Sequence, residues 1–377
     1  MNLETFLTRI PKVELHCHLH GAVKVRSFID IATKNGIDLP YYSKPEELYA
    51  YRDHKKFLEI YRRVCYSVQT QDDFRRITYE TLEEASLSGV RYREMFWSPM
   101  EHLGVGVSFK TALDGIIDGI HDAERDFGIV CRIIAGMNRE KTPEEAVEIV
   151  HLMIENPREE LIGLGLGANE EGNPPEKFWK AYRLAADAGF HRTAHAGEMR
   201  GHYRNIETCL DLLGCERIGH GYRIIENEDI MKRCRDDGVV FEVTPFGRSY
   251  VLVDKDHPGE VVNFPVVSSG QELGLIDERS EVNWSRHPLK SMANYGLKIM
   301  INSDDPGIFM VDPAGAYIHA AMNIGFNPNE IKGFIMNGID GAWIEESDKS
   351  MWKKTWGEEI DALISQLDPE YAQNHIR

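Results

Sequence analysis

The sequence predicts an α/β fold, a (β/α)8 barrel of the TIM type with extra helices after the first strand and a long loop after the seventh. Eight short β-branched runs recur along the chain, and amphipathic stretches of helical spacing separate them. Strands that alternate with helices pair in parallel, and eight such units in 377 residues indicate a closed barrel. A doubly wound sheet is the alternative, but no GxGxxG turn follows the first run.

The expected strands end in polar residues or glycine. They are the runs 13–19, 90–97, 129–137, 161–168, 191–195, 217–221, 239–244 and 298–303. The intervening segments carry helix signals at their ends. TPEEAVEIVHLMIENP starts with Thr–Pro–Glu–Glu, and PPEKFWKAYRLAADAG starts at proline and closes on glycine.

Two connections are too long for simple crossovers. Residues 20–89 follow the first strand and residues 245–297 follow the seventh, at the strand ends where barrel enzymes build their pockets. The stretch HKKFLEIYRRVCYSV in the first connection has the pattern of an amphipathic helix. We expect residues 1–377 to form a single domain, in which 20–89 is a helical lid insertion over the pocket mouth.

Charge and composition exclude several classes of partner. The formal net charge is −18, so the surface repels nucleic acid and anionic lipid, and a small molecule is the expected ligand. No apolar run approaches the roughly 20 residues of a membrane helix. The six cysteines form no CxxC pair and indicate buried free thiols in a reducing cytoplasm. No signal peptide is expected at the N-terminus, and the sequence leaves the oligomeric state open.

The stretch VELHCHLH carries three histidines at alternate positions near the N-terminus. Because side chains alternate along a strand, His16 and His18 point to the same face, near the strand's carboxyl end. Two imidazoles so placed can bind one divalent cation. The spacing alone equally fits two buried, hydrogen-bonded histidines.

Other strand ends bring further ligand-type residues. TAHAGE contributes His195 and Glu198, RIGHGY contributes His220, and INSDDP contributes Asp304 and Asp305. In a barrel these ends converge, and burying so many polar groups without partners would cost several kcal/mol.

Three histidines and a carboxylate predict a mononuclear catalytic metal site, with Glu198 and His220 as proton carriers beside it. The fourth strand, LIGLGLGAN, offers no Lys or Glu to bridge a second ion. Of the adjacent aspartates, one can bind the metal while the other faces substrate.

The chain resembles the adenosine deaminase family of metal-dependent aminohydrolases. The motifs PKVELHCHLHGA, HAGE, ERIGHGY, FEVTP and NSDDPGIF stand in the family's order between residues 11 and about 309. The resemblance implies one Zn²⁺ per chain, a purine substrate and a hydrolytic deamination at C6. The implied zinc ligands are His16, His18, His195 and Asp304.

The resemblance also implies roles in the reaction. Glu198 would protonate the purine at N1, His220 would orient and deprotonate the attacking water, and Asp305 would contact N7 and the new hydroxyl. Phe57 and Tyr61 lie in the stretch that matches the family's apolar lid.

The departures from the family concern the substrate. His20 stands where adenosine deaminases have the aspartate that contacts the ribose 5′-hydroxyl, and Ala168 replaces a glycine whose amide approaches N3. Thr244 replaces the cysteine of a Cys-Pro pair. By strand alternation His20 would face the pocket mouth and touch substrate.

A basic rim is expected from Arg200, His202, Arg204 and Arg248 in the neighbouring loops. Together these features favour deamination of adenosine, 2′-deoxyadenosine or a close 6-aminopurine relative. The alternatives are adenine, an N6-substituted adenine and a 5′-extended or anionic adenosine derivative. A non-catalytic relative is a third class, but every ligand and Glu198 are in place.

Overall fold

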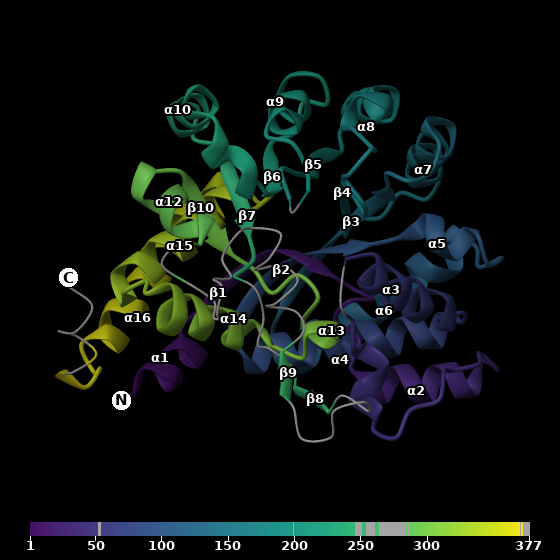
Figure 1. The fold of residues 1–377 in the computed structure, drawn as a ribbon, viewed down its shortest axis with the longest axis horizontal. Coiled ribbons are helices and arrows are strands. Elements are labelled where there is room, and N and C mark those ends of the chain that lie inside the picture. Colours follow the sequence, from purple (N-terminus) through teal and green to yellow (C-terminus); the bar gives the residue numbers. More distant parts are fainter. Residues whose placement is uncertain are drawn as a thin grey trace.

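The computed structural model describes residues 1–51, 54–198, 200–245, 251–253, 261–263, 284, 287–369 and 371. Eight parallel strands stand in sequence order around a nearly closed barrel, with helices on the outside (Figure 1). The strands are β1 (Lys12–His18), β2 (Val90–Trp97), β3 (Val130–Asn138), β4 (Leu161–Gly167), β5 (His191–Ala196), β6 (Arg217–His220), β7 (Val240–Val243) and β10 (Lys298–Ile301). The predicted barrel and its eight strands are confirmed, with shifts of one or two residues at most ends.

The barrel closes between its first and last strands just beyond the end of β10. The amide of His18 donates to the Asp304 carbonyl (2.8 Å), and the amide of Asp304 donates to the His16 carbonyl (3.1 Å). The side chain of Asn302 also accepts the amides of Leu15 and His16. These bonds fix the chain around Asp304 against the histidine-bearing strand.

Helices connect the strands and cover the barrel. They are α1 (Leu3–Arg9), α2 (Val25–Lys34), η1 (Pro45–Tyr49), α3 (His54–Ser67), α4 (Gln71–Leu87), α5 (Pro99–Leu103), α6 (Phe109–Phe127), α7 (Pro143–Glu155), η2 (Pro175–Phe178), α8 (Trp179–Asp187), α9 (Arg204–Asp211), η3 (Tyr222–Glu226), α10 (Glu228–Asp236), α12 (Pro288–Tyr295), α13 (Pro306–Phe309), α14 (Pro313–His319), η5 (Ala320–Ile324), α15 (Pro328–Gly341) and α16 (Glu346–Ile364). The predicted start of α7 is a capping box between Thr142 and Glu145.

The connection after β1 contains the expected additional helices. Helix α4 packs against β2 and beside α6, so it is the barrel helix of this unit. The additional elements are therefore α2, η1 and α3. Helix α3 coincides with the amphipathic stretch, and its Leu58, Tyr61 and Val64 are buried.

Of the long connection after β7, the structure describes α12, Trp284 and two short antiparallel strands, β8 (Val251–Val253) and β9 (Val261–Asn263). Most of the predicted 245–297 loop, Arg248 included, lies outside the described residues. All six cysteines are buried and unpaired, as expected. Within the described part of the chain, no helix is both long and apolar enough to span a bilayer.

Candidate metal centre and catalytic site

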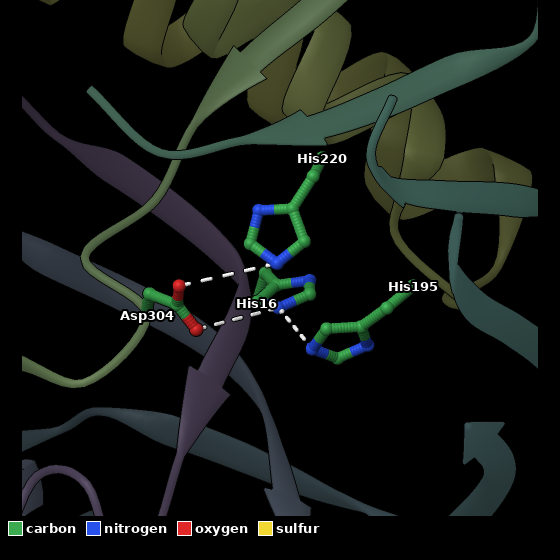
Figure 2. Close-up of side chains that lie close together, drawn as sticks. All are labelled: His16, His195, His220 and Asp304. Atoms are coloured by element: carbon green, nitrogen blue, oxygen red, sulfur yellow. Dashed lines mark hydrogen bonds and ion pairs between the residues drawn. The ribbon is translucent and has the colours of Figure 1, made fainter. Parts of the chain in front are cut away.

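Four strand ends bring a cluster of imidazoles and one carboxylate together at the carboxyl face of the barrel. Figure 2 shows His16 from β1, His195 from β5, His220 from β6 and Asp304 pointing toward one another. Their donor atoms all lie within 4.8 Å of one another. His18 joins them, with its Nε2 3.1 Å from His195 Nε2 and 3.3 Å from Asp304 Oδ1.

The spacing of these atoms fits one zinc-sized cation held by all four side chains. Ligand atoms about 2.05 Å from Zn²⁺ in a tetrahedron lie about 3.3 Å from each other. The Nε2 atom of His16 is 3.1 Å from His195 Nε2 and 3.5 Å from Asp304 Oδ1. With the His18 distances, four such separations fall between 3.1 and 3.5 Å. Three imidazoles and one carboxylate are also a donor set that zinc prefers.

The electrostatics of the cluster favour a positive charge at its centre. Burial disfavours a charged imidazole, yet the carboxylates of Asp304 and Glu242 outweigh it and raise the pKa of His16 to about 9. Burial also opposes ionisation of Asp304, but His16 and His18 hold the pKa of that carboxyl well below its usual range. An ionised Asp304 between imidazoles is a ready anionic ligand.

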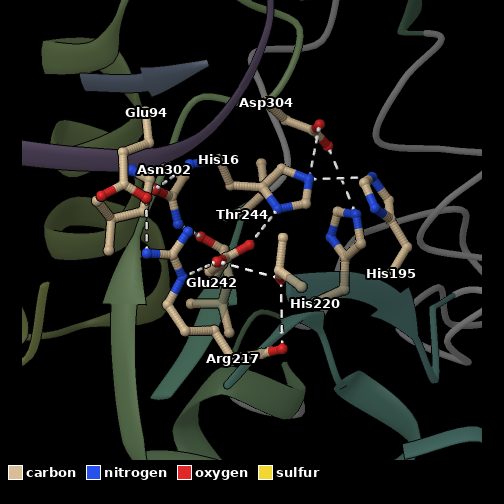
Figure 3. Close-up of polar contacts among 12 residues, drawn as sticks. His16, Glu94, His195, Arg217, His220, Glu242, Thr244, Asn302 and Asp304 are labelled. Atoms are coloured by element: carbon tan, nitrogen blue, oxygen red, sulfur yellow. Dashed lines mark hydrogen bonds and ion pairs between the residues drawn. The ribbon is translucent and has the colours of Figure 1, made fainter. Parts of the chain in front are cut away.

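A buried ionic network holds the His16 ring through its Nδ1 atom (Figure 3). The Nδ1 atom of His16 is 2.8 Å from Glu242 Oε2, so Nδ1–H donates, and a metal that displaces the proton on Nε2 would take the lone pair of that atom. Arg217 donates through Nε to Glu242 (2.5 Å) and pairs with Glu94 (2.7 Å). These three charged side chains have at most 1% exposure, so each depends on the others for charge compensation.

Replacing Glu242 by glutamine should weaken metal binding about 10–100-fold, the usual effect of losing a carboxylate behind a ligating histidine. The amide cannot reproduce the charge that orients the His16 ring and offsets Arg217. Competition with a chelator measures the affinity. The surface variant Glu160→Gln, whose partner His121 is exposed, is the control. Unchanged affinity in Glu242→Gln would show that His16 needs no such support.

Glu198 lies beside the cluster, next to the imidazole of His220. His220 Nε2 is 3.7 Å from Glu198 Oε1 and 4.0 Å from Asp304 Oδ2. The Tyr222 hydroxyl donates to the Thr244 carbonyl (2.9 Å), so at 3.1 Å it accepts from Nδ1–H of His220. That bond leaves the lone pair of His220 on Nε2, directed at the cluster.

Asp305 lies next to the cluster with an unused carboxyl oxygen. Its Oδ1 is buried and has no hydrogen-bond partner. Burial and the adjacent Asp304 carboxylate both raise the pKa of Asp305 well above its usual range. Gly21 packs directly under this carboxyl, and a Cβ at that position would overlap Oδ1. A buried polar group without a partner, on a pocket wall, is suited to a ligand.

Comparison with known proteins agrees with this geometry. The family model "Adenosine deaminase" matches residues 11–258 and 277–355. This chain belongs to the adenosine deaminase family. It is 30% identical over 356 residues to an adenine deaminase of Vibrio parahaemolyticus, covering 93% of this chain and 96% of that protein. The family and the donor set together make this protein a metal-dependent aminohydrolase.

Solved structures resemble this deaminase over nearly its whole length. An amidohydrolase from Burkholderia ambifaria with bound Zn is 38% identical, with a TM-score of 0.85 and coverage of 96% of this chain and 94% of that one. The adenine deaminase of Arthrobacter aurescens is 30% identical, with a TM-score of 0.81 and coverage of 93% and 99%. An N6-methyl-AMP deaminase from Arabidopsis thaliana, at 19% identity and a TM-score of 0.74, shares the fold.

The pocket of this deaminase opens over the cluster and has largely aromatic walls. Phe57, Leu58 and Tyr61 from α3 line it, as do Phe96 and Phe309. Glu198, His220, Asp304, Asp305 and Ala168 line it as well. All predicted site residues except His16 and His20 therefore border one cavity, and His16 lies beneath it in the cluster.

The structure overturns the expectation that His20 faces the pocket. His20 is fully buried, does not line the cavity, and its Nε2 is 2.9 Å from Nε2 of His102. Strand β1 ends at His18, and His20 lies in the turn that follows. Alternation of side chains therefore no longer applies at this position.

The expected basic rim is also absent from the described residues that line the pocket. Arg200, His202 and Arg204 do not border the cavity, and Arg200 contacts the Glu171 carboxylate. Arg62 is the one arginine of the described lining, and it pairs with Glu140. The wall beyond β2 and β3 instead carries the carboxylate of Glu101, which accepts from Asn138 (2.7 Å).

Three of the four described non-glycine residues with positive φ lie at strand ends in this site. They are Ala168 (68°), His220 (62°) and Asp304 (64°), and Met310 is the fourth. A left-handed backbone costs an L-residue about 1–2 kcal/mol. Strain of this kind collects at functional sites, where the surrounding structure holds it in place.

Proposed function

We propose that this enzyme removes the 6-amino group of an adenine-type purine by hydrolysis, giving a 6-oxopurine and ammonia, with one Zn²⁺ per chain. The observation that carries the proposal is Glu198 beside a three-histidine, one-aspartate cluster under an aromatic pocket. His16, His18, His195 and Asp304 are the proposed ligands. A bound zinc ion lowers the pKa of water to about 7 and so supplies hydroxide at neutral pH.

The side chains of the chain itself would handle the protons. Glu198 would protonate the ring at N1, which makes C6 electrophilic. The Nε2 lone pair of His220 would orient the attacking water and accept its proton. The Asp305 carboxyl, which borders the pocket, would contact N7 and the new hydroxyl. Phe57 and Tyr61 of the lid insertion, residues 20–89, would cover the flat apolar face of the base.

Free adenine is the first candidate substrate, and adenosine or 2′-deoxyadenosine the second. The relatives from Vibrio parahaemolyticus and Arthrobacter aurescens, each aligned over 93% of this chain, are named adenine deaminases. In addition, position 20, where adenosine deaminases place the aspartate that contacts the ribose 5′-hydroxyl, holds a histidine turned away from the cavity. Ser98, Glu101 and Asn138 give the pocket wall polar groups suited to the hydroxyls of a ribose, so the nucleosides are the second candidates.

A substrate panel with chromatographic detection of the 6-oxopurine product tests the proposal. Adenine, adenosine, 2′-deoxyadenosine, an N6-methylated adenine and AMP are compared by kcat/KM on zinc-loaded enzyme. We expect the highest value for adenine. We expect a low value for AMP, because the one arginine of the described pocket lining, Arg62, is paired with Glu140, and the neighbouring Glu101 carboxylate would repel a phosphate. Formation of a 6-oxopurine from none of these compounds would overturn the proposed function, and a marked preference for AMP would overturn the choice of substrate.

A further inference from the structure

The backbone that carries Glu198 is held by a buried carboxylate from the preceding strand end. Glu170 follows β4, and its Oε1 accepts the amide of Gly197 (2.9 Å) while its Oε2 accepts the amide of Glu198 (2.9 Å). Asn205 Nδ2 donates to the same Oε1 (2.6 Å). Both carboxyl oxygens of Glu170 are thus used, and the residue is only 7% exposed.

A buried arginine joins the ends of β4 and β5 next to this carboxylate. Arg139 donates through Nε to the carbonyl of Gly167 (3.2 Å) and through Nη2 to the carbonyl of His195. Its Nη1 lies 3.9 Å from Glu170 Oε1 and has no hydrogen-bond partner. The guanidinium has no exposed surface, so its charge and that of Glu170 compensate each other.

The turn between His195 and Glu198 has a backbone shape that binds a carboxylate. Gly197 has a φ of +65°, so the chain reverses there and the successive amides of Gly197 and Glu198 point in the same direction. Adjacent amides in such a turn form a concave site for an anion. The Glu170 carboxylate fills it, and Gly201 packs so closely on Glu170 that a Cβ there would overlap the carboxyl group.

We infer that Glu170, supported by Arg139, is a positioning residue that sets the location of the Glu198 carboxyl over the substrate ring. The inference rests on the proposed role of Glu198 as general acid. Glu170 touches neither the pocket nor the metal cluster, since the lining residues do not include it. Its direct contacts with the segment that carries Glu198 are the two amide hydrogen bonds. A second route runs through Arg139 to the carbonyl of His195, and the metal content of the variants separates the two routes.

The test is a double-mutant cycle on the metal-loaded enzyme. Glu170→Gln should lower kcat about 10–100-fold, the scale expected for misplacing a reacting group by about 1 Å, with KM changed less than about threefold. Metal content should stay unchanged. In a Glu198→Gln background, Glu170→Gln should cause almost no further loss, because residues that act through one another are not additive.

Two further variants keep the result interpretable. Gly201→Ala should reproduce the loss in kcat by displacing the Glu170 carboxyl, without removing a charge. Glu171→Gln, on the exposed neighbouring side chain, should leave kcat unchanged. The inference fails if Glu170→Gln and Gly201→Ala keep normal kcat, or if the losses from positions 170 and 198 multiply. A near-normal rate for Glu198→Gln alone overturns the proposed function instead, and this inference with it.

Discussion

Replacing His16 by alanine should remove both the bound metal and the deaminase activity. His16 Nε2 lies in the cluster, 3.1 Å from His195 Nε2 and 3.5 Å from Asp304 Oδ1. The substitution also leaves the buried Glu242 carboxylate without its imidazole partner. We expect metal content to fall from about one ion per chain to near zero.

Elemental analysis and ammonia release on the same preparation measure this effect. His121→Ala is the matched control, because His121 is an exposed histidine paired with Glu160 at the surface. A folded His16→Ala protein that still holds one ion per chain would exclude His16 as a ligand. Thermal unfolding of both variants separates metal loss from a loss of structure.

Glu198→Gln should keep the metal but lower kcat by about 10²–10⁴-fold, the contribution usual for a general acid. The amide has nearly the shape of the carboxyl, and the hydrogen bond from its backbone amide to Glu170 does not depend on the side chain. The variant therefore loses the proton to be transferred while the surrounding geometry is retained. Single-turnover rates, together with metal analysis, give the measurement.

A near-normal rate in the Glu198→Gln variant would mean that another group protonates the ring. Asp305 is the nearest alternative, since its carboxyl also borders the pocket. Asp305→Asn, measured alongside, distinguishes the two carboxyls. If Asp305→Asn abolishes turnover while Glu198→Gln keeps a near-normal rate, the role assigned to Glu198 is wrong.

The barrel and the cluster could be predicted from the sequence because both follow from local pattern. Each β-branched run is a strand buried on both faces, and barrel topology alone brings the ends of distant strands together. His16, His195, His220 and Asp304 each stand at the end of such a run, so their meeting required no knowledge of side-chain contacts.

Features that depend on where a strand stops, or on contacts between distant segments, could not be predicted in this way. Alternation correctly placed His16 and His18 but failed at His20, two residues after β1 ends. Glu242 stands in the motif FEVTP, but its contact with His16 spans 226 positions of chain and could not be predicted from that motif. A glutamate inside the apolar stretch VVFEVTP was the available signal, because a charge is rarely buried in a strand without a partner.

The positive φ angles of Ala168, His220 and Asp304 lower the free energy of unfolding of the barrel, although they shape the site. Glycine at position 168 would relax the backbone, and so would a shift of either of the other two strand ends away from the cluster. Selection for heat resistance alone would therefore favour substitutions that loosen the active site, a common trade between stability and activity. In an evolved thermostable variant, changes at these three positions would be the first place to look for lost turnover.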